Sequence, residues 1–293
     1  MNPRLHVVDG TFELFRAHYS KRPSFTAPDG RQLKATIGLL QSMIALLHDP
    51  SERLTHVAVA FDNPIRSFRN ELFAGYKSDA GIDPELYAQF DAAEEALAAL
   101  GFVVWSMKRY EAYDALATAT ARFAGEVETV RILSVDKDLG QCLTAPNARL
   151  VDRIRKVEYD AEGIRVKLGV APALIPDYLA LVGDSADGIP GLPGFGAKSA
   201  AALLNHFGPL DDVPRDVVWE LPLRGAEKLR RTFVEHFDAA QLYRRLATLV
   251  RDVPLPQREL SELAFDGVPR SRFIAWAEAR GASFLGERVE RWR

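Results

Sequence analysis

Disulfide chemistry and membrane-spanning sequence are both missing from this chain. A single cysteine, Cys142, leaves no disulfide framework and is typical of proteins from a reducing compartment. No apolar run approaches the roughly 18 consecutive residues of a transmembrane helix. The N-terminal apolar stretch reaches Asp9 too early for the core of a signal peptide. We therefore expect a cytoplasmic protein with no membrane partner.

A surplus of basic residues is missing as well. The 293 residues carry 37 Lys and Arg against 40 Asp and Glu, a formal net charge of -3. Nucleic-acid-binding proteins usually carry a basic surplus, so this balance argues against that class unless the acids are concentrated in one place. Apolar residues make up 47% and charged residues 26%, which is ordinary globular usage and excludes a disordered chain.

The first half of the chain alternates short apolar runs with helical patterns. Helices are predicted at about 34–47 and 84–100, and the apolar runs lie at 5–10, 56–62, 101–107 and 129–136. Buried apolar runs that alternate with helices are typical of a parallel sheet covered on both faces. We predict an α/β core over 1–158, a helical module over 159–252, and a C-terminal strap with short helices over 253–293.

Acidic residues follow three of the apolar runs directly, at Asp9, Asp62 and Asp136. Ligands of open parallel sheets bind outside the carboxyl ends of the strands, so these acids should converge on one crevice. The alternative is that each aspartate caps the next helix or starts a turn. Three converging carboxylates repel one another unless cations balance them, which favours a binding site.

Further acids come in pairs. Glu111 and Asp114 are spaced to share one face of a helix start, and the other pairs are Asp136 with Asp138 and Asp184 with Asp187. Paired carboxylates supply the hard oxygen ligands that Mg²⁺ or Mn²⁺ prefers, whereas no His or Cys cluster has zinc spacing. For Glu111 and Asp114, favourable charge in a first helical turn is a competing explanation.

The segment GDSADGIPGLPGFGAKSAAALL, at 183–204, is dense in Gly and Pro. It is not a P-loop, because Ala197 separates Gly196 from Lys198. It fits a helix–hairpin–helix in which Gly194 and Gly196 allow a sharp turn, and the N–H groups of the next helix start bind a phosphate. A tight turn without a ligand is the alternative. Lys198 beside the glycines favours phosphate, and the expected DNA-binding residues are Gly194, Gly196, Lys198 and Ser199.

These motifs together resemble the bacterial 5′→3′ exonuclease and flap endonuclease family, which includes the N-terminal nuclease domain of DNA polymerase I. The resemblance covers about residues 5–207, in the family's order, and rests on VVDGTFELFRA, VAFD, FRNELFAGYKSD, YEAYDA, SVDKDL and LVGDSADGIPGLPGFGAKSA. It implies a PIN-like α/β nuclease core with a helix–three-turn–helix module. It also implies a stand-alone, monomeric enzyme that acts on DNA with 5′ ends or flaps.

The resemblance further implies two divalent metal ions, Mg²⁺ or Mn²⁺. The family's metal-ligating acids fall on Asp9, Asp62, Glu111, Asp114, Asp136, Asp138, Asp184 and Asp187. Lys77 matches a lysine that contacts the scissile phosphate, and Arg69 matches a basic residue of the mobile arch at about 64–110. Phe68, Phe73 and Tyr76 are stacking or packing residues of that arch. A potassium ion would bind backbone carbonyls around Gly191, Leu192, Gly194 and Gly196.

The sequence departs from the family pattern at three positions. Tyr113 stands where the family has a metal-ligating acid, and a neutral phenol is a poor ligand for a hard cation. Asp79 makes the arch less basic, and Gly188 replaces a usual Asn. An active nuclease, a slow nuclease and a structure-specific DNA-binding protein without cleavage all remain open. A PIN-type ribonuclease shares the strand-end acids but lacks the 183–204 hairpin.

The charge balance changes once the predicted site is set aside. Without its eight metal-site acids, the remaining chain has a net charge of +5 instead of -3, since eight negative charges are removed. Arg224, Lys228, Arg230 and Arg231, together with Lys198, are the basic residues expected to follow the DNA phosphates. The composition is therefore compatible with DNA binding.

Overall fold

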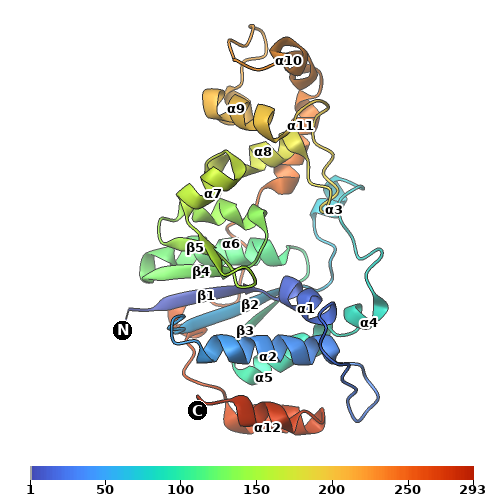
Figure 1. The fold of residues 1–293 in the computed structure, drawn as a ribbon, viewed down its shortest axis with the longest axis vertical. Helices are drawn as coiled ribbons and strands as arrows, with labels where there is room; N and C mark the ends of the chain where they lie inside the picture. The colour runs from blue at the N-terminus through green and yellow to red at the C-terminus, as the bar shows by residue number, and fades with distance from the viewer. Residues whose placement is uncertain (1) are drawn as a thin grey trace.

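A computed structural model describes residues 2–293, and its centre is a six-stranded sheet (Figure 1). The strand order is β3-β2-β1-β4-β5-β6, and every neighbouring pair is parallel except β5 with β6. The strands are β1 (Arg4–Asp9), β2 (His56–Asp62), β3 (Val103–Met107), β4 (Thr129–Leu133), β5 (Ala148–Asp152) and β6 (Val157–Tyr159). The parallel sheet was predicted from the apolar runs, whereas β5 and β6 were not.

Helices cover both faces of the sheet, as the near-continuous apolar strands require. One face carries α1 (Gly10–His18), α2 (Lys34–His48) and α5 (Phe90–Leu100), and the other carries α6 (Ala112–Phe123), the 3₁₀ segment η2 (Lys137–Thr144) and α7 (Ala161–Leu168). Alternate residues of β1 enter opposite cores, since Val7 packs on the α6 side and Val8 on the α2 side. The sheet is therefore fixed in register from both faces.

The segment 64–89 leaves the sheet after β2 and leads into α5. It contains two single-turn helices, α3 (Arg69–Leu72) and α4 (Pro84–Tyr87). The predicted arch of 64–110 is too long, because α5 and β3 belong to the packed core. From here on, "arch segment" means residues 64–89.

The helical module extends away from the sheet on the side of α7 (Figure 1). It consists of η3 (Pro172–Leu174), α8 (Ile175–Val182), α9 (Ala197–Phe207), η4 (Leu210–Asp212), α10 (Ala226–Glu235) and α11 (Phe237–Ala247). Its apolar side chains, such as Leu179 and Phe233, join the same buried cluster as the α6 face of the sheet. The predicted helical second half is confirmed in its secondary structure.

The C-terminal strap returns to the sheet. Gln257 accepts a hydrogen bond from Trp105 Nε1 at 2.8 Å, and Phe265 N donates to Thr55 O at 2.8 Å. The chain then forms η5 (Leu260–Leu263), α12 (Arg270–Ala279) and η6 (Ser283–Arg288), and α12 packs beside α5. Within residues 2–293, no helix is long and apolar enough to cross a bilayer.

Candidate active site

A crevice of about 400 Å³ opens at the carboxyl ends of β1 and β2. Asp9, Asp62, Asp136 and Asp187 line it, together with Lys77 and Tyr113. Strand β1 lies between β2 and β4: β2 and β3 are added on one side of it and β4 to β6 on the other, so the strand order reverses at this point. Such switch points are where open α/β sheets bind ligands. The crevice therefore lies where the three strand-end acids predicted it.

Each strand-end aspartate also stabilises local backbone, so the capping alternative holds alongside the binding one. Asp9 Oδ1 accepts from Phe12 N at 2.9 Å, and Asp136 Oδ1 accepts from Asp138 N at 2.9 Å. Asp62 Oδ1 accepts from Ala112 N at 2.8 Å, at the start of α6. One oxygen of each acid is thus used to fix its orientation.

The environment of these acids disfavours negative charge. Burial raises the pKa of Asp9 to about 7, against the opposing effect of its hydrogen bonds from Phe12 and Ser134. Burial likewise raises the pKa of Asp62. A bound cation would offset this unfavourable desolvation, which is the usual reason that buried carboxylates gather at a metal site.

Lys77 joins two acids across the crevice. Its Nζ lies 2.9 Å from Glu111 Oε2 and 3.0 Å from Asp187 Oδ1. Burial alone would raise the pKa of Glu111, but Lys77 and Arg69 outweigh it and lower that pKa to about 2. Glu111 is therefore ionised and held in place by a protein cation.

A second lysine, Lys137, also pairs with two of the predicted acids. Lys137 Nζ lies 2.6 Å from Asp184 Oδ2 and 3.5 Å from Asp138 Oδ1. Asp138 is 5% exposed, its Oδ1 has no hydrogen-bond partner, and burial raises its pKa to about 8. Lys137 was missed as a site residue, although the motif SVDKDL places it between the predicted acids Asp136 and Asp138.

The donor set is chemically suited to a hard divalent cation. It consists of carboxylate oxygens, and Asp138 Oδ1 is a buried acceptor that lacks a donor. In this structure, no group of three or more His, Cys, Asp or Glu side chains among residues 2–293 is gathered closely enough to hold an ion. Lys77 and Lys137 lie among the acids instead, as their counter-ions.

Arg69 and Asp114 lie outside the crevice, in a buried ion pair. Arg69 is 1% exposed and Asp114 is fully buried, and the guanidinium Nη1 and Nη2 each donate to the carboxylate at 2.8 Å. Asp114 also accepts from Glu111 N at 2.9 Å and Val250 N at 2.9 Å. This position does not fit a catalytic role for Arg69 or a metal-ligating role for Asp114, because both side chains are fully committed to internal partners.

Tyr113 occupies the middle of the acidic crevice. Its hydroxyl donates to Asp136 Oδ2 at 3.0 Å, and burial among Asp9, Asp136 and Asp62 raises the pKa of the phenol well above its ordinary value. The phenol is therefore neutral and occupies the second oxygen of Asp136. Of the arch aromatics, Tyr76 is buried and Phe73 packs on Tyr243, so both have packing roles.

The Gly-rich hairpin forms one wall of a basic groove. Gly194 has a φ of +85°, which favours glycine, and α9 begins just after Gly196. Ser199 Oγ accepts from Gly196 N at 3.0 Å, so this hydroxyl supports the helix start. The groove measures about 680 Å³, and its charged lining residues are Lys198, Arg224 and Lys228.

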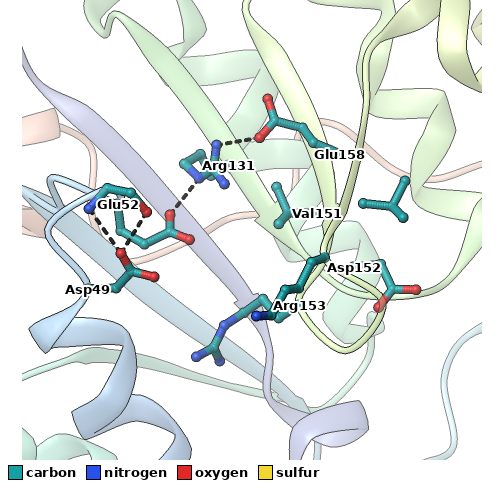
Figure 2. A pocket seen from close by; sticks show the side chains of 10 residues that line it. Asp49, Glu52, Arg131, Val151, Asp152, Arg153 and Glu158 are labelled. Carbon is teal, nitrogen blue, oxygen red and sulfur yellow. Dashed lines mark hydrogen bonds and ion pairs between the residues drawn. The ribbon is translucent and has the colours of Figure 1, made fainter.

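A further pocket, of about 370 Å³, lies between the α2–β2 connection and the β5–β6 hairpin (Figure 2). Its charges neutralise one another: Arg131 lies 2.6 Å from Glu52 and 2.7 Å from Glu158, and buried His6 Nε2 lies 2.9 Å from Glu52. Burial would raise the pKa of Glu52, but His6 and Arg131 outweigh it and lower that pKa to about 2. This pocket is a structural charge cluster that the sequence did not predict.

Comparison with known families agrees with the geometry. Residues 4–169 match the model of the 5′-3′ exonuclease N-terminal resolvase-like domain, and residues 170–270 match the 5′-3′ exonuclease C-terminal SAM fold. The chain belongs to the 5′-3′ exonuclease family. The resemblance inferred from the motifs is thereby confirmed.

The relatives of this 5′-3′ exonuclease family member include DNA polymerases much longer than this chain and an exonuclease of similar length. DNA polymerase I of Bacillus caldotenax is 33% identical over 99% of this chain, which spans 33% of that polymerase. A protein of Aquifex aeolicus named 5′-3′ exonuclease is 31% identical over 88% of this chain and 84% of its own length. The chain thus spans about a third of the polymerases that it matches.

Solved structures share the fold of this family member. The bacteriophage T5 D15 flap endonuclease, in a pseudo-enzyme-product complex with DNA and metal ions, has a TM-score of 0.65 at 20% identity, over 97% of this chain and 96% of that one. The catalytic core of Rad2 with a DNA substrate has a TM-score of 0.62 at 15% identity, over 98% and 92%. The predicted PIN-like α/β core with a helical second unit is confirmed.

Proposed function

We propose that this chain is a metal-dependent 5′→3′ exonuclease and structure-specific 5′-flap endonuclease that hydrolyses DNA phosphodiester bonds. The observation that carries the proposal is the crevice, which is lined by the strand-end carboxylates of Asp9, Asp62 and Asp136 together with Asp187 and Lys77. The family membership supports the same activity. The relative named 5′-3′ exonuclease matches 88% of this chain over 84% of its own length, which supports the same activity.

Two divalent ions, Mg²⁺ or Mn²⁺, suit the donors of the crevice. The acids that would hold them are Asp9, Asp62, Glu111, Asp136, Asp138, Asp184 and Asp187. When bound in pairs, such ions stabilise both the attacking and the leaving oxygen of an in-line displacement. Asp114 has a different role in this proposal: it accepts from Glu111 N and so orients Glu111 through the backbone.

Lys77 is the side chain best placed to contact the substrate phosphate. Its ammonium is partly exposed to the crevice, and its two partners are carboxylates that suit a metal ion. Because a phosphate needs a positive partner in a partly desolvated site, we assign Lys77 to substrate orientation and charge stabilisation. Tyr113 keeps Asp136 in place through the hydrogen bond from its hydroxyl.

DNA would reach the crevice from the groove of the helical module. The start of α9 at Gly196 and the side chains of Lys198, Arg224 and Lys228 offer sequence-independent phosphate contacts. We propose that residues 1–158 perform the chemistry and 159–252 hold the duplex of a monomeric enzyme. A potassium ion at the carbonyls of Gly191, Leu192, Gly194 and Gly196 is part of the same proposal. T5 and Rad2 structures with DNA support this partner.

The deciding experiment incubates the protein with a labelled 5′-flap DNA and Mg²⁺ or Mn²⁺. The wild type and the exposed-site control Asp216→Ala should both cleave, whereas Asp136→Ala should lose activity but remain folded, with only the small loss of stability expected from removing a cap. Flap binding without cleavage by the wild type would favour the alternative of a structure-specific DNA-binding protein. Full cleavage by Asp136→Ala would show that the site is assigned wrongly.

A further inference from the structure

The arch segment and the 184–189 turn touch at two glycines. A Cβ atom on Gly188 would lie 2.1 Å from Gly75 O and 3.2 Å from the carbonyl carbon of Gly75. Real Cβ atoms essentially never approach another heavy atom within 3.0 Å, so a side chain at position 188 cannot coexist with this contact. Gly188 also has a φ of +74°. The absence of a side chain is therefore what allows the two segments to meet.

Both sides of this contact are held firmly. On the turn, Asp184 N donates to Ile189 O at 2.8 Å and Ile189 N donates to Asp184 O at 2.8 Å. On the arch segment, Asn70 Nδ2 donates to Lys77 O at 2.8 Å and to Tyr76 O at 3.3 Å. A bulkier residue at position 188 would therefore have to move the whole 75–77 stretch and not a single atom.

The residues next to the contact belong to the proposed site. Lys77 N donates to Asp187 O at 3.0 Å, and its ammonium lies between Asp187 and Glu111 at 3.0 and 2.9 Å. The hydroxyl of Tyr76 lies 3.3 Å from Glu111 Oε2. The position of the Lys77 ammonium thus depends on how closely the backbone at Gly75 approaches the turn at Gly188.

We propose that Gly188 is a positioning residue for Lys77: its missing side chain lets the arch segment seat on the turn and places the Lys77 ammonium between Glu111 and Asp187. The expected effect of Gly188 on DNA cleavage rests on the proposed nuclease function, whereas its effect on the position of Lys77 does not. A methyl group at position 188 must separate the segments by roughly 1 Å, and a misplacement of that size can lower catalytic rates about 100-fold.

The test compares Gly188→Ala with Gly30→Ala. Gly30 has a φ of +86°, and a Cβ there would meet nothing within 4 Å, so the control shares the unfavourable backbone conformation without the close contact. Hydrogen exchange of the metal-free proteins reports directly on the Lys77 amide, which is bonded to Asp187 O. We expect exchange at this amide to accelerate at least tenfold in Gly188→Ala and to stay unchanged in Gly30→Ala.

Flap cleavage supplies the second readout. Gly188→Ala should lower kcat about 100-fold with little change in KM, and it should have no further effect when combined with Lys77→Met. Unchanged exchange at the Lys77 amide would overturn the proposal, and so would a Gly188→Ala protein that fails to fold beside a folded Gly30→Ala. If the wild type does not cleave, the proposed function fails, while the exchange comparison still decides the role of Gly188.

Discussion

The buried arginine of the arch segment allows a sharp prediction about stability. Arg69 donates to Asp114 through Nη1 and Nη2, to Leu246 O at 2.8 Å and to Thr248 O at 2.9 Å, and it is 1% exposed. Replacing Arg69 with Met keeps much of the side-chain volume but removes all of these donors. Asp114 would then be a buried carboxylate without its cation, and two carbonyl groups would lose their partners.

The expected loss of stability follows from the free-energy cost of leaving the Asp114 carboxylate buried without its cationic partner. Breaking such a pair from one side typically lowers the free energy of unfolding by about 3–5 kcal/mol. Because domains are stable by only roughly 5–15 kcal/mol, this is a large share of the total. At roughly 2–4 °C per kcal/mol, the midpoint of thermal unfolding should fall by about 10 °C.

Thermal and urea unfolding of Arg69→Met measure this effect directly. Arg66→Met is the matched control, since Arg66 lies in the same segment but its side chain is 67% exposed and its pair with Asp79 is a surface contact at 3.4 Å. The control should change stability by less than about 1 kcal/mol. Arg69→Met with Asp114→Leu should recover part of the loss. A stable Arg69→Met protein that no longer cleaves DNA would refute this reasoning and restore a direct role for Arg69 at the substrate.

Two further predictions concern Tyr113 and Glu52. Tyr113→Asp should raise Mn²⁺ affinity by calorimetry and the flap cleavage rate, each roughly tenfold, because it adds a hard oxygen donor beside Asp136; a lower rate would mean that the site is organised around the phenol. Glu52→Gln should lower the free energy of unfolding at pH 7 by roughly 2 kcal/mol, a value discounted for partial solvation. Because the pKa of Glu52 in the folded protein is about 2 and its ordinary value is 4.5, the ionised carboxylate stabilises the fold above pH 4.5, and this stability is lost as the pH falls through 2. Urea unfolding at pH 7 and pH 3 should therefore show a smaller difference at pH 3, and an equal difference would contradict the assignment.

Local sequence signals predicted the placement of the crevice well. Asp9, Asp62 and Asp136 follow apolar runs, and the carboxyl ends of parallel strands share one edge, so their convergence needed no tertiary information. The short strand β5 was missed because ARLVD is brief and follows no predicted helix. Its antiparallel partner β6 has three residues and only partial burial, which leaves almost no periodic signal.

The side-chain partners could not be predicted from local spacing. Glu111 and Asp114 are three residues apart, which suggests a shared direction, yet Glu111 lies between Lys77 and Arg69 whereas Asp114 pairs with Arg69 alone. That division depends on the path of the arch segment and on carbonyl groups from the end of α11. Lys137 is adjacent to predicted acids, but its pairing with Asp184 requires the fold to bring the 183–204 hairpin beside η2. Long-range contacts of this kind have no counterpart in the sequence pattern.

The C-terminal strap has a consequence for the order of assembly during synthesis. Trp105, in the edge strand β3, and Arg122, in α6, both bond to Gln257, and Phe265 bonds back to Thr55. During synthesis, Gln257 and Phe265 leave the ribosome after the strands that they contact. The nascent sheet unit therefore lacks the contacts of the strap until the last forty or so residues have emerged. Until then, the surface that the strap covers is accessible to chaperones and proteases. Truncations that spare every crevice residue but remove the strap should for this reason reduce the yield of folded protein.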